Sequence, residues 1–141
     1  MSIPPFSIFS AISELFVTAG VLFVVRRNWT RRAFPGALFL MVALFEALVN
    51  VLYMAHRASR AATGVDTVAP LMKLFFAGHG LLSLLAYVAF VILGVFAFQD
   101  QKRNRWFFAE HPRLTWTFVA VWVVSILSGE GIFVARYLWR G

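Results

Sequence analysis

The sequence predicts an all-α integral membrane protein, built as an up-down bundle of four helices. Hydrophobic residues make up 61% of the 141 residues and charged residues only 13%, whereas soluble domains are about half apolar and a quarter charged. The apolar residues form four long runs, at approximately 8–25, 34–55, 70–98 and 114–138. Because the connections are short, neighbouring helices should be antiparallel within a single transmembrane domain, residues 1–141.

Each run is long enough to cross a bilayer. A hydrocarbon core of about 30 Å needs about 20 residues at 1.5 Å per residue, and a backbone in lipid must satisfy its own hydrogen bonds, which favours helices. The first run ends at RRNWTRR, the second at HRASR and the third at QDQKRNR. Proline marks the expected starts of the last three helices, at Pro35, Pro70 and Pro112.

The basic residues predict the orientation in the membrane. The net charge is +7, but no basic face with interleaved aromatic residues argues for nucleic-acid binding. Loops one and three carry Arg26, Arg27, Arg31, Arg32, Lys102, Arg103, Arg105 and Arg113. The opposite side carries fewer basic residues, namely Arg57, Arg60, Lys73, Arg136 and Arg140. The positive-inside rule therefore predicts a multi-pass protein, surrounded by membrane lipids, with both termini outside.

Four ionisable side chains lie inside the predicted membrane segments, where such groups are costly and mark function. They fall one to a helix, at Glu14, Glu46, His79 and Glu130. Counting from the outer helix ends places all four roughly 9–14 Å below the outer edge of the membrane. Glycines flank two of them, in AGHGL and SGEGI. We interpret these glycines as room beside the ligand side chains and expect a local bend in the last helix at SGEGI.

These four side chains together predict a metal site. Carboxylates and an imidazole suit iron, manganese or zinc, and because the chain has no cysteine, thiolate sites are excluded. The helical repeat adds three hydrogen-bonding residues to the same faces: Asn50, Ser83 and Tyr87. In a purely structural alternative, His79 bonds to serine or tyrosine, and the carboxylates are protonated or paired with Arg57, Lys73 or Arg136.

The remaining histidines suggest further hypotheses. His56 lies near Met54 and Met72, and imidazole with thioether groups suits copper. A haem b between His56 and His79 is a second alternative. His111 lies on the predicted opposite side of the membrane, where we expect it to join Glu110 in a helix-start cap.

The chain resembles the YozB-like family of small four-helix bacterial membrane proteins of unknown function. The similarity rests on Gly-His early in the third helix and on HPRLTWTFVAVWVVSILSGEGIFVARYL, with His111-Pro112-Arg113, Trp122 and Ser128-Gly129 at places typical of the family. Its histidines match His56, His79 and His111. This chain lacks a histidine at the start of helix two and adds the three glutamates. The resemblance implies the bacterial cytoplasmic (inner) membrane and a link to haem–copper (cytochrome) oxidase assembly.

We therefore interpret the chain as a metal-binding membrane protein with a Glu/His site in the outer half of the bundle, linked to respiratory or electron-transfer complexes. One alternative is a non-catalytic accessory subunit of a larger respiratory or photosynthetic complex, or a homo-oligomer. Another is a membrane enzyme or proton relay that acts on a lipophilic substrate such as a quinone or an isoprenoid. The sequence leaves enzymatic activity undecided.

Overall fold

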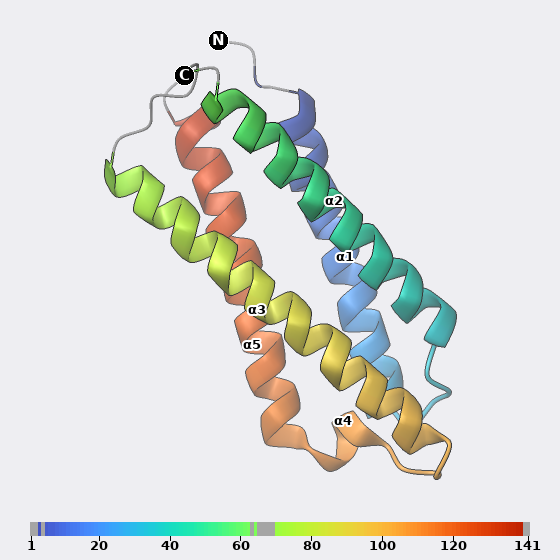
Figure 1. Ribbon diagram of the computed structural model, residues 1–141. Helices are drawn as coiled ribbons and strands as arrows, with labels where there is room; N and C mark the ends of the chain where they lie inside the picture. Colours follow the sequence, from blue (N-terminus) through green and yellow to red (C-terminus); the bar gives the residue numbers. More distant parts are fainter. Residues whose placement is uncertain (1–2, 4, 63, 65–69, 140–141) are drawn as a thin grey trace.

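The computed structural model describes residues 3, 5–62, 64 and 70–139, and all regular structure within them is helical. Four long helices run up and down: α1 (Pro5–Trp29), α2 (Gly36–Ala62), α3 (Pro70–Gln101) and α5 (Pro112–Phe133) (Figure 1). The short helix α4 (Phe107–Glu110) precedes α5, and the π-helix η1 (Val134–Leu138) continues it. Within these described residues, four helical spans are long and apolar enough to cross a membrane. The predicted all-α, multi-pass bundle is confirmed.

The helix starts follow the prolines. Helix α3 begins at Pro70 and α5 at Pro112, while α2 begins directly after Pro35. The last helix stays α-helical through SGEGI, and the change to π geometry comes only at Val134, whose N–H is shared between the carbonyls of Glu130 and Gly131. Helix α4 was not predicted, because its four residues carry no apolar period.

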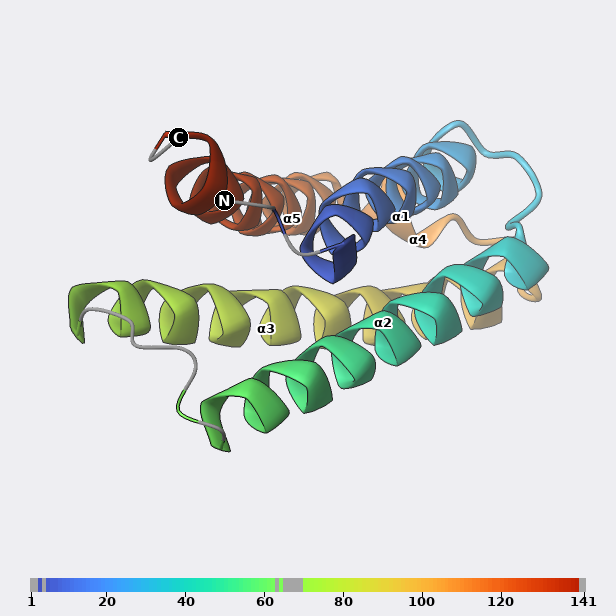
Figure 2. The same ribbon diagram turned by 90° about the horizontal axis from the view of Figure 1, so that it is seen from above.

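The bundle has two layers (Figure 2). Helices α1 and α5 form one layer and α2 and α3 the other, and the closest packing joins α3 to α5 and α1 to α2. Helices α2 and α3 lie near one another at residues 36 and 101 and diverge towards residues 62 and 70. We call this diverging end, which also holds the start of α1 and all of η1, the open end of the bundle. The opposite end, with residues 30–35 and 102–111, is the loop end.

Among the described residues, the buried hydrophobic core lies in the half of the bundle nearest the loop end. Its centre is an aromatic cluster in which the Phe90 ring contacts Phe39, Phe118 and Trp122 at centroid distances of 5.0–6.3 Å. The core also includes Val17, Val21, Val24, Val25, Phe34, Val42, Ala43, Ala86, Leu93, Ala97, Phe107 and Phe108. Large side chains outside the core, such as Phe16 at 75% exposure, face the surrounding lipid.

Side-chain hydrogen bonds fasten the loop end. The Phe34 N–H donates to Gln101 Oε1 at 2.6 Å, which ties the first loop to the end of α3. The Phe108 N–H donates to Oδ1 of the fully buried Asn28 at 2.9 Å, which ties α4 to α1. His111 does not form the expected cap with Glu110: its Nδ1 bonds to the Phe107 carbonyl, and Glu110 pairs with Arg105 at 3.5 Å.

Gly94 allows α3 to approach α2 within this core. A Cβ atom at Gly94 would collide with the ring of Phe39, which is held between Phe34 and Phe90 and has little freedom to move. We expect Gly94→Ala to destabilise the fold by about 1–3 kcal/mol. Thermal unfolding in detergent measures the effect, with Gly131→Ala as the control because a Cβ there meets no atom within 4 Å. Equal melting temperatures for the two variants would contradict this packing.

Packing changes character toward the open end. Within the described residues, nothing is buried on α1 before Ser13, on α2 after Val49, on α3 before Ala86 or on α5 and η1 after Ser125. The helices still surround a common axis there, but polar side chains replace the apolar core. The candidate site lies in this half.

Candidate functional site

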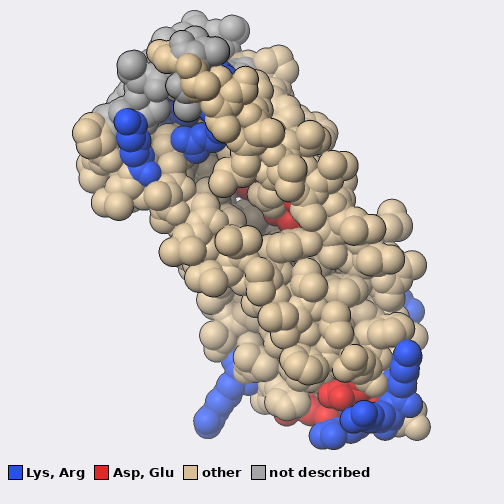
Figure 3. Space-filling view, in the orientation of Figure 1, with Lys and Arg blue, Asp and Glu red and all other residues tan. Residues whose placement is uncertain are grey.

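A chamber of about 1170 Å³ occupies the bundle at its open end. All four long helices and η1 line it, and its walls mix apolar side chains with polar ones. The ionisable lining residues are Glu14, Tyr53, Arg57, Lys73, His79, Tyr87, Glu130, Arg136 and Tyr137. Figure 3 shows acidic atoms inside a hollow near the middle of the face, with basic side chains nearer the open end. Within the chamber, the acidic side chains therefore lie deeper than the basic ones.

The floor of the chamber is a junction of α1, α3 and α5 at Gly129. A Cβ atom built on Gly129 would lie 2.7 Å from Cε1 and 3.0 Å from Nε2 of His79, and 3.2 Å from Oε2 of Glu14. The missing side chain is thus what lets the imidazole and the carboxylate both approach this point. Gly78, Gly80 and Gly131 have only open space at the same position. The predicted role of glycine as room between ligands therefore applies to Gly129 alone.

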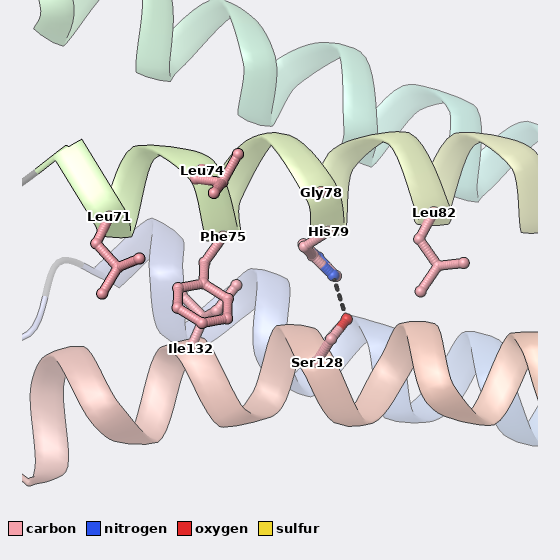
Figure 4. A pocket seen from close by; sticks show the side chains of 8 residues that line it. All are labelled: Leu71, Leu74, Phe75, Gly78, His79, Leu82, Ser128 and Ile132. Carbon is pink, nitrogen blue, oxygen red and sulfur yellow. Dashed lines mark hydrogen bonds between the residues drawn. The ribbon is translucent and has the colours of Figure 1, made fainter.

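Hydrogen bonds orient the His79 ring. Its Nδ1 lies 2.7 Å from Ser128 Oγ across the α3–α5 contact (Figure 4). The Ser128 hydroxyl donates its proton to the Ser125 carbonyl at 2.7 Å, so Ser128 Oγ must accept the proton of Nδ1. In the neutral ring, Nε2 then carries a lone pair. This nitrogen lies on the chamber side, beside Gly129 and 3.5 Å from Ser83 Oγ.

A second, smaller cavity reaches His79 from the outside of the bundle. It has a volume of about 230 Å³ and is an apolar groove between α3 and α5, lined chiefly by leucines together with Phe75, Gly78 and Ile132. Figure 4 shows the His79–Ser128 bond at its base. The imidazole therefore separates this lateral groove from the chamber, and it lines both.

Glu130 carries the strongest sign of an incomplete site. Its Oε1 is buried, and no described residue gives it a hydrogen bond. A buried polar atom without a partner is costly and is rare in native proteins. Glu130 lines the chamber together with Glu14. The floor of the chamber thus holds hydrogen-bond acceptors, among them Glu130 Oε1, that a donor group of a ligand would satisfy.

The remaining predicted residues take different places. Asn50 donates from Nδ2 to Glu46 Oε1 at 2.9 Å, and Asn50, but not Glu46, lines the chamber. Ser83 bonds to Ser125 at 3.0 Å between their hydroxyl oxygens, next to His79. The Tyr87 hydroxyl donates to the carbonyl of Ala43 at 2.9 Å, which fixes its ring to α2.

Basic residues from three elements gather nearer the open end, and we call Arg57, Lys73 and Arg136 the basic rim. Arg57 from α2 and Arg136 from η1 both approach the ring of Phe76 on α3, with guanidinium carbons 4.1 and 5.5 Å from its centroid. Lys73 lies one turn before Phe76 on the same helix. All four residues line the chamber. Arg140, which entered the charge prediction, lies outside the described residues.

The predicted metal ligands do not assemble into one cluster. Among residues 3, 5–62, 64 and 70–139, no three His, Asp or Glu side chains come together so that they could hold a metal ion. His79 and Glu14 meet at Gly129, whereas Glu46 is engaged by Asn50. The iron, manganese or zinc site stays a prediction.

The copper and haem hypotheses also stay predictions. The His56 ring is exposed and lies 5.1 Å from the Phe6 ring between centroids. Met54 lines the chamber, and Met72 is half-buried on α3.

Sequence reasoning missed the residues that orient the site. Ser128 and Ser125 lie three residues apart on α5, one helical turn that faces His79, and this spacing was a usable signal. Phe76, three residues before His79, looks in the sequence like any other apolar residue of α3. Its contact with two arginines depends on how α2, α3 and η1 are rotated, which the sequence pattern does not specify.

Searches of known protein families, of curated proteins and of solved structures find no match to this chain. The fold and site therefore define a class only: a four-helix, multi-pass membrane protein with a chamber of mixed apolar and polar walls in one half. The resemblance to the YozB-like family stays a prediction.

Proposed function

We propose that this protein binds a lipid-like molecule in the chamber between its four helices and holds the polar group of that molecule at Glu14, His79 and Glu130. The observation that carries the proposal is the buried, unpartnered Oε1 of Glu130 inside a chamber of about 1170 Å³. Ligand sites for small molecules typically measure about 300–1000 Å³ and combine apolar walls with a few polar groups. The chamber is somewhat larger than this range, and its walls have the expected mixture of apolar side chains and a few polar groups.

The floor of the chamber selects for hydrogen-bond donors. His79 offers the lone pair of Nε2, and the carboxylates of Glu14 and Glu130 offer acceptor oxygens. A hydroxyl or ammonium group of a ligand would satisfy these atoms, and the same side chains are suited to exchange a proton with it. This matches the class of lipophilic substrate that includes quinols and isoprenoid alcohols. A metal centre has less support, because no three ligand side chains converge in the part of the chain that the structure describes.

Residues of both α2 and α3 line the chamber in the half where these helices diverge, and we propose that the ligand enters from the bilayer in this half. The two helices separate toward residues 62 and 70, the end at which the chamber lies. With the termini outside a bacterial inner membrane, as the loop charges favour, the chamber faces the outer leaflet.

Solvent extraction of the purified protein tests this function. The protein is isolated in mild detergent, and bound lipophilic compounds are quantified by mass spectrometry relative to bulk membrane lipid. We expect one compound to be enriched, at about one molecule per protein chain. His79→Leu should reduce the amount of this compound bound per chain about tenfold, as expected for a lost hydrogen bond that leaves buried groups unpaired.

His111→Leu is the matched control, since His111 lies at the loop end and is exposed. It should retain the compound. Equal retention by both variants, or extracts no different from bulk lipid, would refute the proposal. A co-purifying protein that fills the space between α2 and α3 would instead favour the accessory-subunit alternative.

A further inference from the structure

We infer that the ligand carries an anionic phosphate head group, which binds at the basic rim of the chamber. The inference rests on the proposed function and adds the ligand's chemical class. It follows from the way in which three elements bring Arg57, Lys73 and Arg136 to one place, above a floor of acceptor groups.

The basic rim is held in position by the protein. The Phe76 ring lies between two guanidinium groups from separate elements, at 4.1 Å from Arg57 and 5.5 Å from Arg136, and Arg136 also lies 5.4 Å from the Tyr137 ring. Such contacts favour a cation over an aromatic face. The Tyr137 hydroxyl in turn meets Ser7 of α1 at 3.3 Å. The rim is therefore joined to all four walls of the chamber.

Like charges gathered in this way favour an anion. Arginine and lysine donate several N–H bonds to phosphate oxygens, and arginine does so in pairs. Among the described residues that line the chamber, the carboxylates are Glu14 and Glu130. Both carboxylates lie at the floor of the chamber. Lys73 is six residues from His79 along its helix, and Arg136 is six residues from Glu130, so a helical rise of about 9 Å separates the rim from the floor. Rim and floor can therefore hold opposite ends of one polar group.

The surroundings favour a lipid as the source of the phosphate. The chamber walls include Val51, Met54, Leu81, Leu84 and Phe133, and the open end lies between diverging helices of a membrane bundle. A free phosphate ion would use the rim but leave these apolar walls uncovered. A phosphate with attached hydrocarbon covers both.

Competition between two phospholipids tests the inference. The protein is reconstituted into bilayers of phosphatidylcholine and phosphatidylglycerol in equal amounts, returned to mild detergent, and analysed by native mass spectrometry. We expect the retained lipid to be enriched in phosphatidylglycerol. Arg57→Gln and Lys73→Gln should each lower the enrichment about fivefold, given the usual contribution of one basic residue near an anionic lipid. Arg57→Lys should keep most of it.

Arg113→Gln is the control, because it removes an exposed positive charge at the loop end. Its enrichment should equal that of the wild type. Retention of phosphatidylcholine and phosphatidylglycerol in equal amounts would overturn this inference but not the proposed function, which the extraction experiment tests separately. No retained lipid at all would remove the proposed function itself. Millimolar inorganic phosphate should not displace the lipid. Displacement would show that the rim binds the free ion and would overturn the lipid assignment.

Discussion

Replacing Gly129 by leucine is expected to block the chamber and reduce retention of the bound lipophilic compound at least tenfold. Even a single Cβ atom at this position would lie 2.7 Å from His79 and 3.2 Å from Glu14, and leucine adds three more carbon atoms in the same place. The His79 ring must then leave Ser128 or push Glu14 aside, so the floor loses the arrangement that presents its acceptor groups. The compound is quantified after solvent extraction of the purified variant.

Gly131 provides a matched control for this result. It lies two residues further along α5, is exposed, and has open space where a side chain would begin. Gly131→Leu makes the same chemical change without touching the chamber floor, and it should retain the compound. If both variants retain it equally, the junction at Gly129 has no part in binding.

Replacing Phe90 by alanine is expected to have the largest effect on stability, a loss of about 3–5 kcal/mol. Phe90 is 1% exposed, and its ring contacts three aromatic rings from α2 and α5. Removing the ring opens a cavity at the centre of the hydrophobic core. Close packing is also the main force that joins helices in a membrane, where apolar burial against lipid gains little.

Phe16→Ala is the corresponding control, since Phe16 is 75% exposed on the lipid-facing side of α1. Unfolding of both variants in detergent, followed by circular dichroism, compares their stabilities. Phe16→Ala should stay within about 1 kcal/mol of the wild type. A similar loss for both variants would mean that the aromatic cluster is not the packed core.

The sequence predicts the number of long helices, their alternating up-and-down order and their approximate limits well. Length and apolar composition are local properties of the chain, and so are the prolines that mark the starts of α3 and α5. Predicted depth was also informative, because Glu14, His79 and Glu130 all line one chamber. These features follow from the rise of a helix and the thickness of a bilayer.

Which residues of the candidate site face one another depends on how the helices are rotated and spaced. Glu46 has the same predicted depth as Glu14, His79 and Glu130. However, it accepts a hydrogen bond from Asn50 and does not line the chamber. The meeting of His79 with Gly129 and Ser128 needs the α3–α5 contact, and the separation of α2 from α3 needs the full three-dimensional packing. A depth count places residues at one level, but it does not show which of them face one another.

Photolabelling with a lipid analogue tests the central claim most directly. A phosphatidylglycerol analogue with a photoreactive group near its head is activated in bilayers that contain the protein, and labelled peptides are mapped by mass spectrometry. The structure predicts labels on chamber-lining residues such as Tyr53, Phe76 and Tyr137, and their loss in Gly129→Leu but not in Gly131→Leu. Labels confined to outward-facing residues such as Phe16 and Leu127, and equal in all variants, would contradict it.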